Sequence, residues 1–206
     1  MNSQKLGIDE AGRGCVLGPL VMAGLRLGAE DMEFIQTLGV QDSKLFGSTV
    51  GAKKKRALLY EQLRAYSHHV EIAEADEVDD YVRRGGLNDL ERSMASKIIA
   101  ALPGAQVMLD GAVMFGPLCN DHIKAENKAD QNHLEVAAAS IIAKHVRDEA
   151  ISALLTPFEP EFGKVKGGGY ANQGTLAFVE WHVQKRGELP LCLRTSYQWK
   201  AIAHLR

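Results

Sequence analysis

The longest helical pattern in the chain runs from Leu134 to about Leu155, and it restricts the fold more than any other segment. From position 136 it contains the run Val-Ala-Ala-Ala-Ser-Ile-Ile-Ala, which is apolar and rich in small side chains. Small side chains let a helix lie close to a sheet, because its backbone can approach the strands. Prolines in the segment 156–160 end the pattern. We therefore expect a long helix packed on a β-sheet.

Short strand-like stretches alternate with longer helical ones in the rest of the chain. The strands are expected over Leu6–Asp9, Val16–Leu27, His69–Ala73, Val107–Leu109 and His122–Glu126. Further helices are expected over Lys53–Tyr66, Asp76–Val82, Leu87–Leu102, Gln173–Arg186 and from near Tyr197. Asn132, followed by Glu135, predicts a capping box at the start of the long helix. This order predicts an α/β fold with a small helical C-terminal extension.

Composition is that of an ordinary globular protein, with 46% hydrophobic and 24% charged residues. We expect a single domain over 1–206, with a core over about 1–155 and a helical extension over about 156–206. The start of the chain lacks the pattern of a secretory leader, and the uncharged run Gly14–Leu25 is too short to span a membrane. Cys15, Cys119 and Cys192 are odd in number and widely spaced, which favours reduced thiols and a cytoplasmic protein.

The net charge of −2 gives no sign of a nucleic-acid partner, so the distribution of charge matters more. Residues 53–56 are Lys-Lys-Lys-Arg, while the segment 71–80 is strongly acidic. Such runs are most often solvated surfaces. A nucleic-acid site in this chain would therefore be a local basic rim around an acidic, metal-neutralised centre.

Four acidic residues fall at strand ends or at the starts of loops. Asp9 and Glu10 lie in the stretch GIDEAGRG, Asp110 follows the apolar run Val-Met-Leu, and Asp130 precedes the long helix. Carboxylates at the ends of separate strands can converge on one point, and oxygen ligands of this kind suit a hard divalent cation such as Mg²⁺. The alternative is that each of them caps a helix, ends a strand or faces solvent.

The first acidic pair raises a geometric problem, because consecutive side chains of a strand point to opposite faces. Asp9 and Glu10 cannot both bind one ion from a regular strand. Either the strand ends at Asp9 and the following turn, which Gly12 makes easier, brings Glu10 round, or one residue contributes a main-chain carbonyl.

A polar stripe runs along the long helix, formed by Ser140, Lys144, Arg147 and Asp148. Their spacing places them on one face of an otherwise apolar helix. A solvated face and a phosphate-binding rim explain this stripe equally well. Lone histidines such as His133 and His145 are interpreted as structural.

Taken together, several motifs resemble the ribonuclease HII family. They are GIDEAGRG at 7–14, Gly18-Pro19, QDSKL at 41–45, LDG at 109–111 and KADQNHLEVAAASIIAKHVRD at 128–148. They occur in the family's order and cover the chain from residue 5 to about 200. The segment AENKAD at 125–130 is similar to the archaeal-type branch of this family.

The resemblance implies a ribonuclease H-like mixed sheet flanked by helices. It implies hydrolysis of the RNA strand of RNA–DNA hybrids and cleavage 5′ of single ribonucleotides embedded in duplex DNA. A two-metal-ion mechanism would leave 3′-hydroxyl and 5′-phosphate ends, with roles in DNA replication and in ribonucleotide removal during repair. The catalytic ligands of Mg²⁺ or Mn²⁺ would be Asp9, Glu10, Asp110 and Asp130.

For substrate binding, the resemblance implies that the turn Gly12-Arg13-Gly14 senses the ribose. The 2′-hydroxyl distinguishes RNA from DNA, and a glycine-flanked backbone can approach it closely. Tyr170 matches the family tyrosine that stacks on the sugar next to the junction. The alternatives are a tight connection at the turn and an anchor of a loop at Tyr170.

Lysines account for the remaining substrate contacts that we expect. Lys44, in a segment that could also be a turn or helix cap, and Lys144 and Lys166 are candidate phosphate contacts. The loop GGGYANQGT around Tyr170 departs from the family patterns. Residues 194–197, Arg-Thr-Ser-Tyr, resemble the family's terminal motif and mark where the helical tail begins.

Two other functions compete with this one. Ribonuclease HIII shares the core but should carry an extra N-terminal domain, whereas six residues precede Gly7 here. A non-catalytic hybrid-binding module would require a lost carboxylate, and all four are present. No QxxLxxFF-like motif is found, so a sliding-clamp contact is not expected. We expect a monomer whose partner is nucleic acid, with no membrane association.

Overall fold

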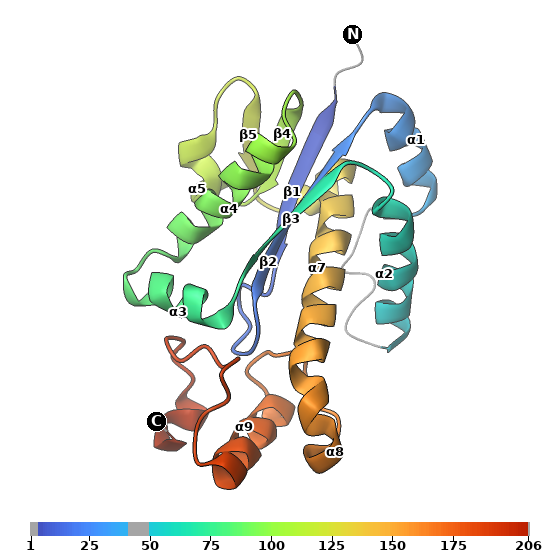
Figure 1. The fold of residues 1–206 in the computed structure, drawn as a ribbon. Helices are drawn as coiled ribbons and strands as arrows, with labels where there is room; N and C mark the ends of the chain where they lie inside the picture. The colour runs from blue at the N-terminus through green and yellow to red at the C-terminus, as the bar shows by residue number, and fades with distance from the viewer. Residues whose placement is uncertain (1–3, 41–49, 206) are drawn as a thin grey trace. The chain divides into compact units, whose positions relative to one another are not determined.

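A computed structural model describes residues 4–40 and 50–205 of the chain. Its described residues form a mixed five-stranded sheet in the order β3-β2-β1-β4-β5 (Figure 1). The strands are β1 (Lys5–Ala11), β2 (Leu20–Leu27), β3 (His68–Ala73), β4 (Gln106–Asp110) and β5 (Ile123–Glu126). β1 pairs antiparallel with β2 and parallel with β4, and β4 pairs parallel with β5. The predicted α/β fold with a mixed sheet is confirmed.

Helices connect and cover the strands. The α-helices are α1 (Ala29–Thr37), α2 (Val50–Leu63), α3 (Ala75–Arg83), α4 (Leu87–Ala101), α5 (Ala112–Phe115), α6 (Ala129–Asn132), α7 (Leu134–Leu155), α8 (Glu159–Phe162) and α9 (Gln173–Arg186). Within residues 4–40 and 50–205, the 3₁₀ segments are η2 (Gly116–Leu118), η3 (Thr156–Phe158) and η4 (Lys200–Leu205). The expected C-terminal helices are therefore present. No helix in the described part of the chain is long and apolar enough to cross a membrane.

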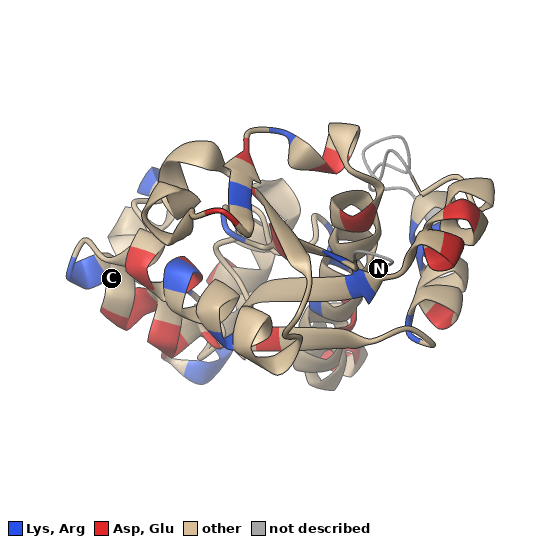
Figure 2. Cartoon of the chain, turned by 90° about the horizontal axis from the view of Figure 1, so that it is seen from above, with Lys and Arg blue, Asp and Glu red and all other residues tan. Residues whose placement is uncertain are grey.

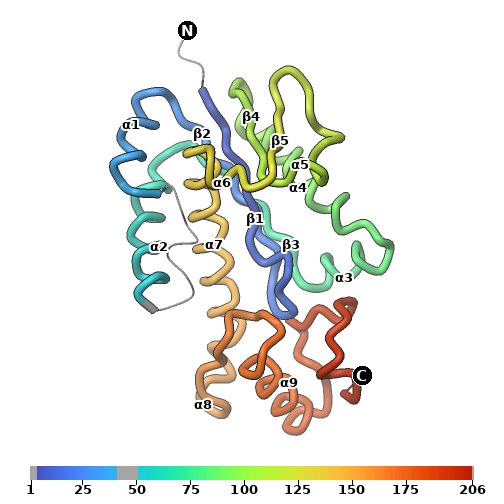
Figure 3. Tube along the Cα trace, turned by 180° about the vertical axis from the view of Figure 1, so that it is seen from behind, coloured from blue at the N-terminus to red at the C-terminus, as the bar shows by residue number. Residues whose placement is uncertain are grey.

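The chain divides into two compact units. The first unit comprises 1–11, 21–71 and 88–145, and the second comprises 12–20, 72–87 and 146–206. In the first unit, α4 and α7 cover opposite faces of the sheet, as the trace in Figures 1 and 3 allows the reader to follow. A Cβ on Gly7 would lie 2.2 Å from the backbone of Glu135 in α7, while one on Gly24 would lie 2.3 Å from Ile98 in α4. These glycines let both helices approach the central hairpin closely.

The long helix extends over the predicted residues, Leu134–Leu155. Its small residues at 137–139, together with Ile141 and Ile142, are almost fully buried. Because Gly7 has no side chain and the buried residues of α7 include alanines, the helix backbone approaches β1 closely, which is the packing that the sequence predicts. The start of α7 is therefore packed directly against β1.

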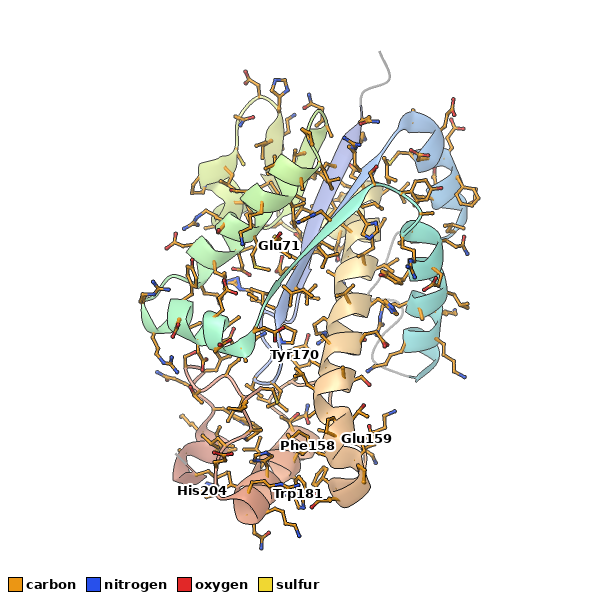
Figure 4. All side chains as sticks on the ribbon, in the orientation of Figure 1. Glu71, Phe158, Glu159, Tyr170, Trp181 and His204 are labelled. Atoms are coloured by element: carbon orange, nitrogen blue, oxygen red, sulfur yellow. The ribbon has the colours of Figure 1, made fainter. Side chains whose placement is uncertain are left out.

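The second unit has its own apolar core. Its buried members are Leu17, Ile151, Leu155, Phe178, Val179, Leu193 and Ile202. Phe158 and Trp181, both labelled in Figure 4, pack at the edge of this core with Phe178, and the Phe158 ring meets the Phe178 ring edge-on at 5.3 Å between centroids. This core joins the segment 12–20 to the C-terminal part of the chain.

Several local predictions were wrong. The second strand begins at Leu20 rather than at Val16, because residues 12–19 form a turn with left-handed glycines at positions 12 and 18. Asn132 ends α6 and so is not the cap of α7; the carbonyl of His133 instead accepts from the Val136 and Ala137 amides. The tail near Tyr197 becomes helical only at Lys200, as a 3₁₀ segment.

Charged residues of both signs are interspersed along the ribbon (Figure 2). The basic run at 53–56 lies on α2, where the lysines are exposed and Arg56 is buried. The acidic run at 71–80 extends from β3 into α3. Neither run is therefore a uniformly solvated surface, since the acidic run also contains the buried Asp79.

Candidate metal centre

Asp9 lies in the middle of the sheet, on β1. The strand continues past it through Glu10 to Ala11, with Asp9 opposite Ala23 and Glu10 opposite Met22 on β2. The alternative in which the strand ends at Asp9 is therefore wrong. Because the strand is regular here, the side chains of Asp9 and Glu10 leave opposite faces of the sheet. The Asp9 side chain is only 6% exposed.

Asp110 reaches the same place from the neighbouring strand. β4 runs parallel to β1 with Leu109 opposite Ile8, so Asp9 and Asp110 follow each other in register at the carboxyl ends of two adjacent strands. β4 ends at Asp110, and Gly111 turns the chain with a φ of 120°, a conformation that favours glycine.

Asp130 comes from α6, the single turn before α7. This turn follows Lys128, whose φ of 61° is the only left-handed conformation of a non-glycine residue among the described residues. The Ala129 amide donates to Oδ1 of Asp110 at 3.1 Å, which ties the start of α6 to the end of β4. Asp130 is 4% exposed. The left-handed backbone of Lys128 and the hydrogen bond from the Ala129 amide thus bring the third carboxylate to the first two.

One carboxylate oxygen from each of Asp9, Asp110 and Asp130 lies within 4.8 Å of the others. We call these residues the carboxylate cluster. Glu10 is not part of it, in keeping with the alternation of side chains along β1. Burial raises the pKa of Asp9 to about 6; Lys144 and a hydrogen bond from Ser140 oppose this shift, while Asp110 adds to it.

Ser140 and Lys144 connect α7 to the cluster. The Lys144 ammonium donates to the Ser140 hydroxyl at 2.5 Å, and Ser140 donates to the Asp9 carboxylate. Ser140 is fully buried and Lys144 is half-buried, so this part of the predicted polar stripe is not a solvated face. The Ser140 hydroxyl thus lies between the Lys144 ammonium and the Asp9 carboxylate and is hydrogen-bonded to both.

A divalent cation fits this donor set. Three carboxylates crowd together, and two of them are almost fully buried. Crowding and burial both disfavour the charged form, and the raised pKa of Asp9 records that cost. Oxygen ligands at one point are what a hard divalent ion requires. The cluster is therefore consistent with a divalent metal site.

The turn Gly12-Arg13-Gly14, which we call the glycine turn, belongs to the second unit. Gly12 has a φ of 92°, and a Cβ there would lie 2.6 Å from the Pro19 carbonyl oxygen. The Cys15 amide donates to the Gly12 carbonyl at 3.1 Å and closes the turn, leaving Gly14 exposed. Only glycine fits the first position of this turn without distortion.

Tyr170, which is labelled in Figure 4, belongs to the same unit and is 47% exposed. The Arg147 guanidinium lies 5.5 Å from the centroid of its ring. Arg147 also donates to the Cys15 sulfur at 3.2 Å. Burial and the neighbouring Cys15 raise the pKa of the Tyr170 hydroxyl. The Arg147 guanidinium thus lies over one face of the ring, while a large part of the residue faces solvent.

Two of the three predicted lysine contacts can be located. Lys144 lies beside the carboxylate cluster in the first unit, and Lys166 is exposed in the loop before Tyr170 in the second. Lys44 lies outside the described residues. The loop that carries Lys166 is held by Asn172, whose side chain donates to the Gly167 carbonyl at 3.0 Å and caps α9.

Sequence reasoning missed the partners of the glycine turn. Arg194 is fully buried and donates to the carbonyls of Gly12 and Gly18, at 2.8 and 2.9 Å. The sequence Arg-Thr-Ser-Tyr at 194–197 indicated the family's terminal motif and the start of the tail, but no contact with the glycine turn. An arginine and a tyrosine three positions apart in the C-terminal segment were the available signal.

Comparison with known proteins identifies the family and the relatives that this chain resembles. The family model of ribonuclease HII matches residues 6–200. The ribonuclease HII of Methanocorpusculum labreanum is 33% identical over 203 residues, covering 93% of this chain and 90% of the relative. In the structure of the PCNA–ribonuclease HII complex from Archaeoglobus fulgidus, the matching chain has a TM-score of 0.79 at 31% identity, covering 96% of this chain and 95% of that one.

A third match concerns the fold alone. Bst ribonuclease HIII, solved in complex with Mn²⁺, has a TM-score of 0.80 at 23% identity, and the match covers 100% of this chain and 71% of that one. The family match and the archaeal relatives confirm the resemblance that the motifs indicate, over nearly the whole chain. This chain belongs to the ribonuclease HII family, the endonucleases that act on RNA–DNA hybrids.

Proposed function

We propose that this protein hydrolyses the RNA strand of hybrids and also cuts duplex DNA on the 5′ side of a single embedded ribonucleotide. The products would carry 3′-hydroxyl and 5′-phosphate ends, and the activity would serve ribonucleotide removal during DNA replication and repair. The observation that carries the proposal is the carboxylate cluster, in which oxygens of three acidic side chains lie within 4.8 Å of one another.

The residues that would hold Mg²⁺ or Mn²⁺ are the three members of the cluster, with Glu10 as a further ligand through its main-chain carbonyl, because its side chain leaves the other face of the sheet. Two such ions, when bound, supply Lewis acids and an activated water for phosphodiester hydrolysis. The chain itself keeps Asp9 ready for this role. Ser140 donates to the Asp9 carboxylate and Lys144 lies behind Ser140, so both favour the ionised form that a cation needs.

Recognition of the ribose is assigned to the glycine turn and to Tyr170. An exposed Gly14 and a closed turn allow backbone groups to approach a sugar without a side chain between them. A 2′-hydroxyl both donates and accepts hydrogen bonds, so main-chain groups can recognise it. The flat face of Tyr170 would stack on the neighbouring deoxyribose, where the missing 2′-hydroxyl leaves room for the ring.

The partner that we propose is nucleic acid, contacted through phosphates by Lys44, Lys144 and Lys166. The Archaeoglobus fulgidus relative was solved in complex with PCNA, a second kind of partner for that protein. The present chain has no QxxLxxFF-like segment, so the proposal includes no contact with a sliding clamp.

A single cleavage assay tests the proposal. Duplex DNA with one ribonucleotide is incubated with Mg²⁺, with Mn²⁺ or with a chelator, and the product ends are mapped. We expect metal-dependent cleavage that leaves the ribonucleotide at the 5′ end of the downstream product. An all-DNA duplex and the variant Asp110→Asn serve as controls without cleavage. Cleavage on the 3′ side, or equal cleavage without metal, would refute the proposal.

A further inference from the structure

The C-terminal segment Cys192–Tyr197, which we call the strap, lies along the residues that follow β1. The Arg194 amide donates to the Val16 carbonyl and the Gly18 amide donates to the Cys192 carbonyl, both at 2.8 Å. Leu193 forms an isolated antiparallel bridge with Leu17. The strap is therefore bound to the segment that contains the glycine turn by main-chain hydrogen bonds within the second unit.

Two side chains of the strap reach the carbonyl groups of the glycine turn. Nη1 of Arg194 donates to the Gly12 carbonyl at 2.8 Å and to the Arg13 carbonyl at 3.3 Å. The Tyr197 hydroxyl accepts from Arg194 at 3.1 Å and donates to the Arg13 carbonyl at 2.7 Å. Arg194 also lies 5.3 Å from the centroid of the Tyr197 ring.

Arg194 is fully buried, and its hydrogen bonds within the described residues go to carbonyl oxygens and to one hydroxyl. A buried charge is costly unless it is well bonded, so a role limited to packing is a poor explanation for an arginine at this position. The rigid fork of the guanidinium can hold several acceptors at fixed angles, which a lysine cannot do.

Fixing these carbonyls also fixes the amides of the turn. In a planar trans peptide the N–H points away from the C=O of the same unit. The Gly12 carbonyl shares its peptide unit with the Arg13 amide, and the Arg13 carbonyl shares its unit with the Gly14 amide. Because Arg194 and Tyr197 bind the two carbonyls, both amides are directed away from the strap, on the side where Gly14 is exposed.

We infer that Arg194 and Tyr197 are positioning residues that orient the backbone amides of the glycine turn toward the ribose of the substrate. They set the preference for a ribonucleotide without touching it. This inference rests on the proposed function of the glycine turn. The strap itself is held in place from its other side by Asp79, which accepts from the amides and hydroxyls of Thr195 and Ser196.

The test compares two variants that each remove one hydroxyl from the strap. Tyr197→Phe loses the bond to the glycine turn, whereas Ser196→Ala loses a bond to Asp79 and leaves the turn contacts in place. Binding of a duplex with one ribonucleotide and of the matching all-DNA duplex is measured by fluorescence anisotropy in a chelator. The quantity compared is the ratio of the two dissociation constants.

We expect Tyr197→Phe to lower the preference for the ribonucleotide about five-fold, the size of one lost hydrogen bond, and Ser196→Ala to keep the wild-type ratio. Arg194→Lys should lower the ratio at least as much, and Tyr197→Phe alone decides if that variant fails to fold. If Tyr197→Phe keeps the wild-type ratio, or weakens binding of both duplexes equally, the inference is overturned while the function of the turn stands. If the wild type itself shows no preference, both fall.

Discussion

The carboxylate cluster and the glycine turn are built on opposite electrostatic principles. In the first unit, burial and, to a smaller extent, the neighbouring Asp110 raise the pKa of Asp9 to about 6. In the second unit, the buried Arg194 is surrounded by carbonyl oxygens, and the pKa of the buried Asp79 is lowered by the hydroxyls and amides of the strap that offset its burial. The first region leaves like charges close together, whereas the second gives its buried charges hydrogen-bond partners, with Nη2 of Arg194 as an exception among the described residues.

This difference follows from what each region is proposed to do. A metal site must keep ligands whose charge is balanced only when the cation arrives, so the free protein carries the cost of their repulsion. A turn that recognises its ligand by backbone hydrogen bonds needs no unbalanced charge in the free protein. The hydrogen bonds that fix its peptide planes also stabilise the fold. Substitutions should therefore change activity and stability in opposite directions in the first region and together in the second.

The largest effect is expected at the carboxylate cluster. Asp9→Asn should reduce cleavage at least about 1,000-fold, because it removes a ligand charge at the centre of the cluster. The same variant should unfold at an equal or higher temperature than the wild type in a chelator, because it also removes the repulsion with Asp110. Product formation and thermal unfolding are measured on the same preparation. An unfolded variant would mean that Asp9 is a structural residue.

A large loss of stability is expected in the second region. Asp79→Ala leaves the amides and hydroxyls of Thr195 and Ser196 without their acceptor, at a cost of about 2–4 kcal/mol in the free energy of unfolding. The exposed Asp80 on the same helix provides the matched control, since Asp80→Ala should cost less than about 0.5 kcal/mol. Denaturant unfolding measures both. Equal losses in the two variants would show that the strap contributes nothing to stability.

The sequence predicted the parts of these regions that depend on local pattern. Carboxylates at the ends of separate strands can converge, which the sequence indicated for Asp9 and Asp110, although β1 continues past Asp9 to Ala11. The position of Asp130 could not be predicted in the same way. It depends on the left-handed backbone of Lys128, and nothing in a lysine predicts that conformation. The helix α1 was also missed, since Ile35 is its only buried residue and gives no apolar period.

The contacts of the glycine turn lay beyond any local pattern. Arg194 and Gly12 are brought together only by the folded chain, and the pairing of a buried arginine with carbonyl groups leaves no periodic mark in the sequence. The turn itself was predictable, because the left-handed Gly12 belongs to a short motif. What could not be predicted was which distant side chains hold it.

The dependence of stability on pH should separate the two regions by sign. The pKa of Asp9 is near 3.8 in the unfolded chain and about 6 in the folded one, so the folded state holds more protons between these values. Stability in a chelator should therefore fall as pH rises from about 4 to about 6, by at most about 3 kcal/mol. Asp79 has a lowered pKa, so its contribution is present above about pH 4 and is lost on further acidification.

Unfolding curves of the wild type, Asp9→Asn and Asp79→Asn across this range provide the measurement. Asp9→Asn should flatten the slope between pH 4 and 6, and Asp79→Asn should leave that slope in place. A slope that persists in Asp9→Asn would show that the titration of Asp9 is not its cause.

The smallest effect concerns recognition without any change at the cluster. Tyr170 lies in the second unit, held by Arg147, and its ring is 47% exposed. Tyr170→Ala should slow cleavage at a single embedded ribonucleotide about five-fold more than cleavage of a long RNA–DNA hybrid, because only the first substrate has a deoxyribose next to the cut on which the ring stacks. Tyr170→Phe should retain the wild-type ratio, since stacking needs the ring and not the hydroxyl. The ratio of kcat/KM on the two substrates cancels any general loss of active protein, so it reports on stacking alone. If Tyr170→Ala slows both substrates by the same factor, the ring serves the loop around it and not the junction, and selection of the ribonucleotide would depend on the glycine turn.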